Sequence, residues 1–348
     1  MARAAKLERP DLGLQPGASS LNQSSNSIGL YSVLLGALCL ASQNIILRVI
    51  FVPSQLFGTI DLGGWLEPSL GSAIFLLWFR TLLMAVLLLA IAYRLYHAVF
   101  SELFQLRHHR VLAGWVILSG LLLAVSLSLL NLSISKMEAG IAIGVFFTHS
   151  AWTAILTWLV WGDRPTRLTF FIMGMIIIGV LLTTISPSPS TVTVSFIGSL
   201  AAISAAWIYA AYNVMAQLCL RPQSVQSKQQ RIHPITFSLV SFWIVVITTS
   251  PSLHYHPMGT LSPSAIELFL TAGFATAFIS LLAYVLLNVG VSRIGAALTS
   301  LISSLTPVLT ALFAWITLNE TLHKQQFLGI TLVAVGIAAL SVSMRRAP

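Results

Sequence analysis

Residues 131–180, NLSISKMEAGIAIGVFFTHSAWTAILTWLVWGDRPTRLTFFIMGMIIIGV, decide the fold, because residues 288–337, NVGVSRIGAALTSLISSLTPVLTALFAWITLNETLHKQQFLGITLVAVGI, align with them without a gap. Identical residues pair at Asn131/Asn288, Ser135/Ser292, Ala139/Ala296, Thr153/Thr310, Ala154/Ala311, Trp158/Trp315, Phe170/Phe327 and Gly179/Gly336. Like charges pair at Lys136/Arg293, Asp163/Glu320 and Arg167/Lys324. Paired Asn, Trp and charged positions are harder to obtain by chance than paired apolar ones, so the pattern predicts an internal duplication.

The composition places this duplication in a membrane. The chain of 348 residues is 57% hydrophobic and 8% charged, with a mean hydropathy of +0.90. A soluble domain carries about 25% charged residues, and a bilayer span needs about 20 apolar ones. The sequence therefore predicts an all-α integral membrane protein with ten transmembrane helices. The apolar windows lie near 28–51, 72–96, 112–131, 139–161, 168–186, 195–219, 234–250, 264–289, 295–318 and 325–344.

The charge distribution predicts an orientation. The net charge is +9, but the basic residues are scattered among loops without interleaved aromatics, which excludes a nucleic-acid partner. Arg48 and Arg80 fall within spans. With both termini in the cytoplasm, every remaining Lys and Arg except Lys136 and Lys324 faces the cytoplasm, as the positive-inside rule requires. We therefore expect a multi-pass protein of the cell (inner or plasma) membrane, with the lipid bilayer as its surroundings.

The expected spans divide into two halves. Residues 1–27 are polar and predict a disordered cytoplasmic tail, with a plastid transit peptide as a weaker alternative. Residues 28–187 form the first five-helix repeat and residues 195–344 the second. Because five is odd, the second repeat enters the membrane upside down. Inverted repeats are typical of secondary transporters, whose substrate site lies near the midplane between the repeats.

The second repeat also resembles a known family. Its ending, LTPVLTALFAWITLNE (305–320) followed by LHKQQFLGITLVAVGIAAL (322–340), resembles the drug/metabolite transporter superfamily in its EamA-like branch. The motif positions are Pro307, Val308, Glu320, Gln326, Gly329 and Gly336, and in the first repeat Ser150, Asp163 and Thr169 replace the proline, glutamate and glutamine. FLLWFR, residues 75–80, resembles the family's arginine-bearing second helix. The resemblance covers residues 28–344 and implies transport of amino acids, drugs or other metabolites.

Polar residues inside the spans are the candidate site, because such groups are costly in lipid. His149 lies in the middle of the fourth span, and its repeat partner is Thr306, beside Pro307. The histidine could bind substrate or carry a proton, or it could be a neutral ring hydrogen-bonded to a neighbour. Pro307 would bend a helix that lines the substrate path.

Further candidates occupy the second, first and sixth spans. Arg80 is a candidate anion contact or gate. Gln43 and Asn44 lie in mid-span, and aligning Asn44 with Asn213 pairs the first span with the sixth. Such amides could line a cavity or join helices by hydrogen bonds. Aromatic or amide neighbours complete the set: Trp152, Trp207, Tyr209, Tyr212, Tyr284 and Asn288.

These features predict a secondary transporter, an exporter of small metabolites, amino acids or drugs, that works by alternating access. The alternative is an organophosphate or nucleotide-sugar antiporter, in which Lys136 and Arg293 would hold the anion. A passive channel is a weaker alternative, since no ring of like polar groups recurs along the spans. No nucleophile–base set, phosphate loop, cofactor motif or metal-ligand spacing appears, so neither an enzyme nor a cofactor is expected. Every acidic residue falls in a tail, loop or span end, so proton coupling would depend on His149.

Overall fold

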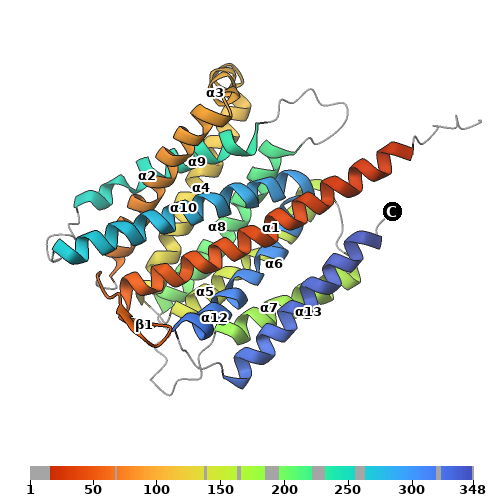
Figure 1. Cartoon of the computed structure of the whole chain (residues 1–348). Coiled ribbons are helices and arrows are strands. Elements are labelled where there is room, and N and C mark those ends of the chain that lie inside the picture. Colours follow the sequence, from red (N-terminus) through yellow and green to blue (C-terminus); the bar gives the residue numbers. More distant parts are fainter. Residues whose placement is uncertain are drawn as a thin grey trace, which may run out of the picture.

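The fold is a bundle of helices in a computed structural model that describes residues 16–66, 69–136, 139–162, 166–184, 196–221, 232–254, 263–318 and 323–346 (Figure 1). The elements in chain order are α1 (Pro16–Phe51), β1 (Ser54–Leu56), β2 (Ile60–Leu62), α2 (Leu70–Leu95), α3 (Ala98–His108), α4 (Arg110–Lys136), α5 (Ala139–Phe147), α6 (His149–Trp161), α7 (Arg167–Thr184), α8 (Phe196–Leu220), α9 (Pro234–Thr249), the short 3-10 helix η1 (Ser250–His254), α10 (Pro263–Ile294), α11 (Ala296–Ser303), α12 (Leu305–Leu318) and α13 (Lys324–Arg346). Asp163 and Glu320, expected at span ends, lie outside the described residues.

The helices make the chain an integral membrane protein. Within the described ranges, seven helical segments are long and apolar enough to cross a bilayer. Three further apolar helices, α7, α9 and α13, are shorter. Together these segments coincide in position with the apolar windows of the sequence, because uninterrupted apolar runs leave the backbone no partners in lipid except its own.

Three local features differ from the sequence-based expectation. Helix α1 begins at Pro16, so residues 16–27 are helical, whereas the sequence predicted a disordered tail there. Proline is well suited to the first helical position, and an established helix extends at little cost. The helix α3 and the β1–β2 hairpin were also not expected from the hydropathy pattern, which detects only long apolar runs. Residues 1–15 of the expected tail lie outside the described residues.

The β1–β2 hairpin closes against the ends of two long helices. Its antiparallel register pairs Gln55 with Asp61. The backbone N–H of Phe57 donates to the carbonyl of Thr317 in α12 at 2.7 Å. Gly63 follows with φ of 104°, and a Cβ there would meet the carbonyl oxygen of Val49 at 2.1 Å. Only glycine fits this approach, which ties the hairpin to α1.

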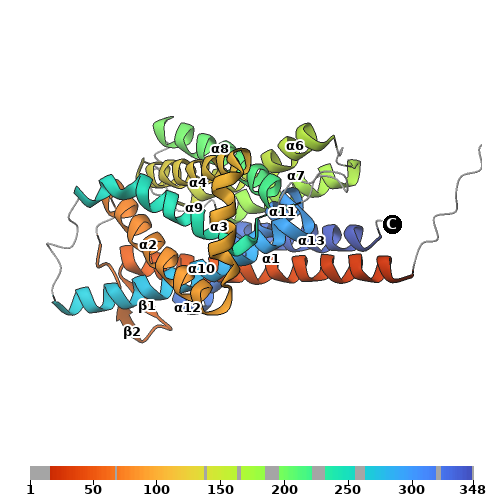
Figure 2. The ribbon, with the colours of Figure 1, turned by 90° about the horizontal axis from the view of Figure 1, so that it is seen from above.

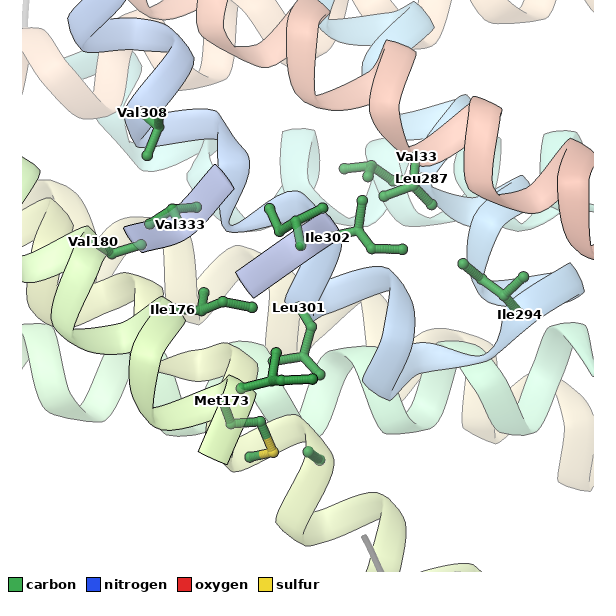
Figure 3. Close-up of a cluster of buried hydrophobic side chains, with 13 residues drawn as sticks. Val33, Met173, Ile176, Val180, Leu287, Ile294, Leu301, Ile302, Val308 and Val333 are labelled. Atoms are coloured by element: carbon green, nitrogen blue, oxygen red, sulfur yellow. The ribbon is translucent and has the colours of Figure 1, made fainter. Parts of the chain in front are cut away.

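The helices pack in recurring pairs. Helix α1 lies along α10, α4 lies along α8, α2 packs on α9, and α7 packs on α13 (Figures 1 and 2). One buried apolar cluster joins α1, α7, α10, α11, α12 and α13, as Figure 3 shows. Its members include Val33, Ile176, Leu301, Ile302 and Val333. This cluster holds the broken helix α11–α12 in the interior of the bundle.

Candidate functional site

An internal cavity lies where α8, α10 and α11 meet. It is lined by Tyr209, Tyr212, Asn213, Tyr284, Leu287, Asn288, Val291, Thr299, Ser300 and Ser303. The space open to the centres of water-sized molecules is about 20 Å³, which is room for about one water. Five candidates from the sequence therefore meet at one place: the three tyrosines Tyr209, Tyr212 and Tyr284 and the two amides Asn213 and Asn288.

A polar stripe on α10 reaches this cavity, which two of its residues, Tyr284 and Asn288, line. Thr276, Ser280, Tyr284 and Asn288 recur every four residues, so they share one face of the helix. The Ser280 hydroxyl donates to Oε1 of Gln43 in α1 at 2.7 Å. The Asn288 amide donates to the hydroxyl of Ser238 in α9 at 2.8 Å. The stripe thus connects α10 to both neighbouring helices through satisfied hydrogen bonds.

Two asparagines make equivalent hydrogen bonds in the two halves of the chain. The Asn44 amide in α1 donates to the hydroxyl of Thr310 in α12 at 3.2 Å. The Asn213 amide in α8 donates to the hydroxyl of Thr153 in α6 at 3.3 Å. Asn44 aligns with Asn213, and Thr153 aligns with Thr310, so each asparagine contacts the opposite half.

The two threonines are themselves held in the same way. Thr153 donates to the carbonyl of His149 at 2.7 Å, and Thr310 donates to the carbonyl of Thr306 at 2.9 Å. His149 and Thr306 also align with each other in the sequence. Asn44 does not line the cavity and Asn213 does, so the amides serve as interhelical contacts, and one of them is also a wall of the cavity.

The fourth and the ninth expected spans, which carry these threonines, are each broken near the middle. The expected helix 139–161 divides into α5 and α6 at Thr148, and the expected helix 295–318 divides into α11 and α12 at Ser304. In the second case Pro307 lacks the N–H that would bond to the carbonyl of Ser303. In the first case no proline is present, and the Thr148 hydroxyl instead donates to the carbonyl of Val145 at 2.6 Å.

Neither nearby hydroxyl, of Ser303 or of Thr306, bonds to the carbonyl that Pro307 leaves without its helical partner. Ser303 donates to the carbonyl of Ser300 at 2.9 Å. The Thr306 hydroxyl is buried and has no hydrogen-bond partner in the described part of the chain. A hydroxyl buried in this state costs free energy, so Thr306 marks a position that a water molecule or a ligand could satisfy.

His149 begins α6 directly after the break and is surrounded by aromatic rings. Its ring centroid lies 4.6 Å from that of Tyr209, 5.1 Å from that of Phe146 and 5.5 Å from that of Phe147. The residue is 2% exposed, and its Nδ1 has no hydrogen-bond partner among the described residues. The ring therefore packs beside the cavity through Tyr209 and retains a free ring nitrogen.

Arg80 lies in the middle part of α2, and its side chain is 8% exposed. Its Nε and Nη1 atoms are buried without a hydrogen-bond partner in the described ranges. Helix α2 packs against α10. The arginine is thus an interior cation on a helix that packs against α10, which carries the cavity-lining Tyr284.

The remaining candidates lie away from the cavity. Trp152 and Trp207 stack on each other with centroids 4.3 Å apart, and Trp207 is 44% exposed. This pair therefore faces the periphery of the bundle. Lys136 and Arg293 are exposed at the ends of α4 and α10, and neither lines the cavity.

The small hydroxyl residues of the site were not predicted from the sequence. Thr276, Ser280, Ser238 and Thr299 are buried and belong to the stripe, to its contacts or to the cavity wall. The four-residue spacing along 276–288 was a usable signal, because it continues through Tyr284 and Asn288. Serine and threonine are common in membrane helices, where they often bond only to their own helix, so composition alone did not distinguish them.

Apolar helices long enough to cross a bilayer, with polar groups gathered in the interior of the bundle, are typical of a membrane transporter. Residues 196–342, from α8 to α13, match the EamA-like transporter family. An uncharacterized transporter of Synechocystis sp. is 31% identical over 320 residues, which cover 91% of this chain and 94% of that protein. The chain belongs to the EamA-like transporter family. It is a membrane transporter whose partners are the lipid bilayer and small-molecule substrates, as the sequence predicted.

A solved crystal structure shares the fold. It aligns with a TM-score of 0.67 over 93% of this chain and 98% of that chain, at 15% sequence identity. The arrangement of helices is therefore similar to one already observed by experiment.

Proposed function

We propose that this protein is a secondary transporter that exports small metabolites such as amino acids or drugs by alternating access. The two moving units are residues 28–187 and 195–344, arranged as inverted repeats of five spans each. The three shorter helices α7, α9 and α13 complete the ten spans. Both termini lie in the cytoplasm, and the protein resides in the cell membrane.

The observation that carries the proposal is the pair of equivalent hydrogen bonds, Asn44 to Thr310 and Asn213 to Thr153. Exchanging the two halves of the chain turns one bond into the other. Such reciprocity is expected of a pseudo-twofold axis in the membrane plane, about which an inward-open and an outward-open state are related.

The packing of whole helices supports the same symmetry. The second-repeat equivalent of α1 is α8, and that of α4 is α10. Exchanging the repeats therefore turns the α1–α10 pair into the α8–α4 pair, and both pairs are present. The α2–α9 and α7–α13 pairs each map onto themselves, and both of these are present as well.

The size of the cavity supports a moving mechanism over a passive pore. A space of about 20 Å³ cannot hold a metabolite, whose binding site is usually about 300 Å³ or more. Substrate can enter only if α8, α10 and α11 separate. The breaks at Thr148 and Ser304 lie where such a motion could bend the helices.

Counterflow in proteoliposomes tests the proposal. Vesicles are loaded with a mixture of unlabelled amino acids, and uptake of each labelled amino acid is followed from outside. A carrier accumulates label above its equilibrium level when unlabelled substrate is inside, because exchange is faster than net transport. A channel shows no such overshoot, and uptake that is independent of the internal amino acids would contradict the proposal.

Variants of the two threonines link the counterflow to the symmetry. We expect Thr153→Val and Thr310→Val to slow exchange to a similar extent, because each loses an equivalent contact. Thr331→Val is the matched control: Thr331 is exposed on α13, and its hydroxyl bonds only to the carbonyl of Phe327 in the same helix. Exchange by the control should equal that of the unmodified protein.

A further inference from the structure

The charge of Arg80 has no counterpart in the part of the chain that the structure describes. The described carboxylates are Asp61 on the hairpin, Glu102 on α3 and Glu267 in the first turns of α10. Asp61 and Glu267 are exposed, and Glu102 accepts a hydrogen bond from Tyr96 at 2.6 Å. None of them forms a salt bridge with Arg80.

An interior cation without a partner is a costly feature. A guanidinium carries five N–H donors, and leaving them buried and unpaired costs far more than an unpaired neutral group. At least two of the nitrogen atoms of Arg80, Nε and Nη1, are in this state among the described residues. Depth in the membrane adds to the cost, because Arg80 lies near neither end of α2.

Arg80 is connected to the cavity through the packing of α2 against α10. Helix α2 packs against α9 and α10, and Tyr284 of α10 is a wall of the cavity. Two more tyrosines, Tyr209 and Tyr212, line the same space. The cavity walls therefore offer aromatic rings, amides and hydroxyls, and Arg80 lies on a helix that packs against α10, one of the three helices that form those walls.

We propose that Arg80 binds the anionic group, a carboxylate or a phosphate, of the molecule that this protein transports. A guanidinium fork matches either group with two parallel hydrogen bonds. The proposal rests on the transport function proposed above and specifies its substrate class: a small organic anion with an aromatic or apolar body.

The first experiment needs no ligand. Thermal unfolding midpoints are compared for the purified full-length protein, Arg80→Met and Arg94→Met. Arg94 is the matched control, because it is exposed in the last turn of the same helix. We expect Arg80→Met to unfold at the same or a higher temperature than the unmodified protein, because a neutral chain replaces an unpaired charge. A clear fall in midpoint for Arg80→Met alone would show that the charge is already satisfied by the protein and would overturn the proposal.

The second experiment uses benzoate, phenyl phosphate and neutral benzamide as probes, at equal ionic strength. We expect at least one of the two anions to raise the unfolding midpoint of the unmodified protein, and its half-maximal concentration to rise about tenfold or more in Arg80→Met. Benzamide should not distinguish the two proteins. The anion that acts identifies carboxylate or phosphate as the recognised group. Stabilisation by neither anion, or equal stabilisation of Arg80→Met, would overturn the proposal.

Two results would distinguish failure of the anion-site proposal from failure of the transport proposal. Counterflow of a neutral or cationic substrate, without an Arg80-dependent effect of anions, would support the carrier function and contradict the anion site. Anion binding that depends on Arg80, without counterflow of any anion, would support the anion site and contradict the carrier function.

Discussion

Individual polar residues in this bundle are placed by hydrogen bonds that join helices rather than by contact with water. Gln43, Asn44, Asn213 and Asn288 each bond to a hydroxyl on another helix. Such a bond contributes about 0.6 kcal/mol, so none of them alone fixes the fold. Together, however, the four bonds join six helices, α1, α6, α8, α9, α10 and α12, through the interior of the bundle.

The two asparagines give a prediction at this scale. We expect Asn44→Ala and Asn213→Ala each to lower the free energy of unfolding by about 0.6 kcal/mol, because each loses one interhelical hydrogen bond. Thermal unfolding in detergent measures the change, and the double variant should show the sum, because the bonds are separate. A large loss in one variant with no loss in the other would contradict their equivalence.

His149 gives a second prediction. We expect His149→Phe to fold, because a ring of similar volume fills the same aromatic surroundings. If His149 carries the coupled proton, exchange by this variant loses its dependence on pH, since phenylalanine cannot titrate. Counterflow measured from pH 5.5 to pH 8, values that bracket the ordinary histidine pKa of about 6.5, gives the test. An unchanged pH profile of exchange would show that His149 does not carry the coupled proton.

At the scale of elements, α3 is attached to α9 through one carboxylate. Glu102 accepts from the backbone N–H of His233 at 3.3 Å and from the hydroxyl of Thr236 at 2.5 Å, and it also accepts from Tyr96 at 2.6 Å. These contacts place a negative charge at the N-terminus of α9, where the helix dipole favours it. Figure 2 shows α3 running across the direction of α1 and α13.

Removing that charge should loosen α3. We expect Glu102→Gln to lower the free energy of unfolding by about 0.5–1 kcal/mol, because the amide keeps the size but loses the charge at the helix terminus. Ser101→Ala is the control, since Ser101 is exposed and bonds only to the carbonyl of Ala98. Hydrogen exchange of the α3 amides should increase in Glu102→Gln alone, and equal exchange in both variants would contradict the attachment.

The same contact should depend on pH. The Tyr96 and His233 rings stack with centroids 4.4 Å apart, and desolvation lowers the pKa of His233 from 6.5, while Glu102 acts in the opposite direction. The folded state therefore favours neutral His233, so its contribution to stability is present above pH 6.5 and is lost as pH falls below that value. Desolvation, followed by the bond to Glu102, raises the pKa of Tyr96 to about 12. The unfolding midpoint of the unmodified protein should fall more between pH 7 and pH 5.5 than that of His233→Gln, and equal falls would contradict this.

Helices α7 and α13 meet through glycine, which gives a further prediction. A Cβ at Gly329 would lie 2.5 Å from the carbonyl oxygen of Gly179, which is backbone and cannot turn aside. Gly329→Ala should therefore separate the helices and cost about 1–3 kcal/mol. Gly174→Ala is the matched control, because a Cβ at Gly174 on α7 meets nothing within 4 Å. Equal unfolding midpoints for the two variants would contradict this close packing.

At the scale of the whole molecule, the proposed topology places the hairpin and α3 on opposite sides of the membrane. In a Cys39→Ala, Cys219→Ala background, we expect Gln55→Cys to react with a membrane-impermeant maleimide added to intact cells. Ser101→Cys should react only after permeabilisation. Both positions are exposed, so access to the reagent depends on the side of the membrane. Labelling of both in intact cells would contradict the topology.

The sequence by itself determined the class of protein, the positions of the helices and the family. Apolar runs must form helices in lipid, and the match of residues 131–180 to residues 288–337 predicts a duplication without any knowledge of the fold. The sequence also provided Tyr209, Tyr212, Asn213, Tyr284 and Asn288, because polar groups at membrane depth are rare enough to notice.

Only the tertiary structure decided which of these residues meet. A hydropathy pattern records how apolar each residue is but not which neighbour its side chain faces, so Trp207 and Tyr209 looked equivalent although one faces the periphery and the other the cavity. Two nitrogen atoms of Arg80, Nε and Nη1, have no hydrogen-bond partner among the described residues, and this depends on which side chains the neighbouring helices bring to α2. Packing of α1, α2, α8 and α10 decides these features, because hydrogen bonding and burial are properties of the assembled bundle.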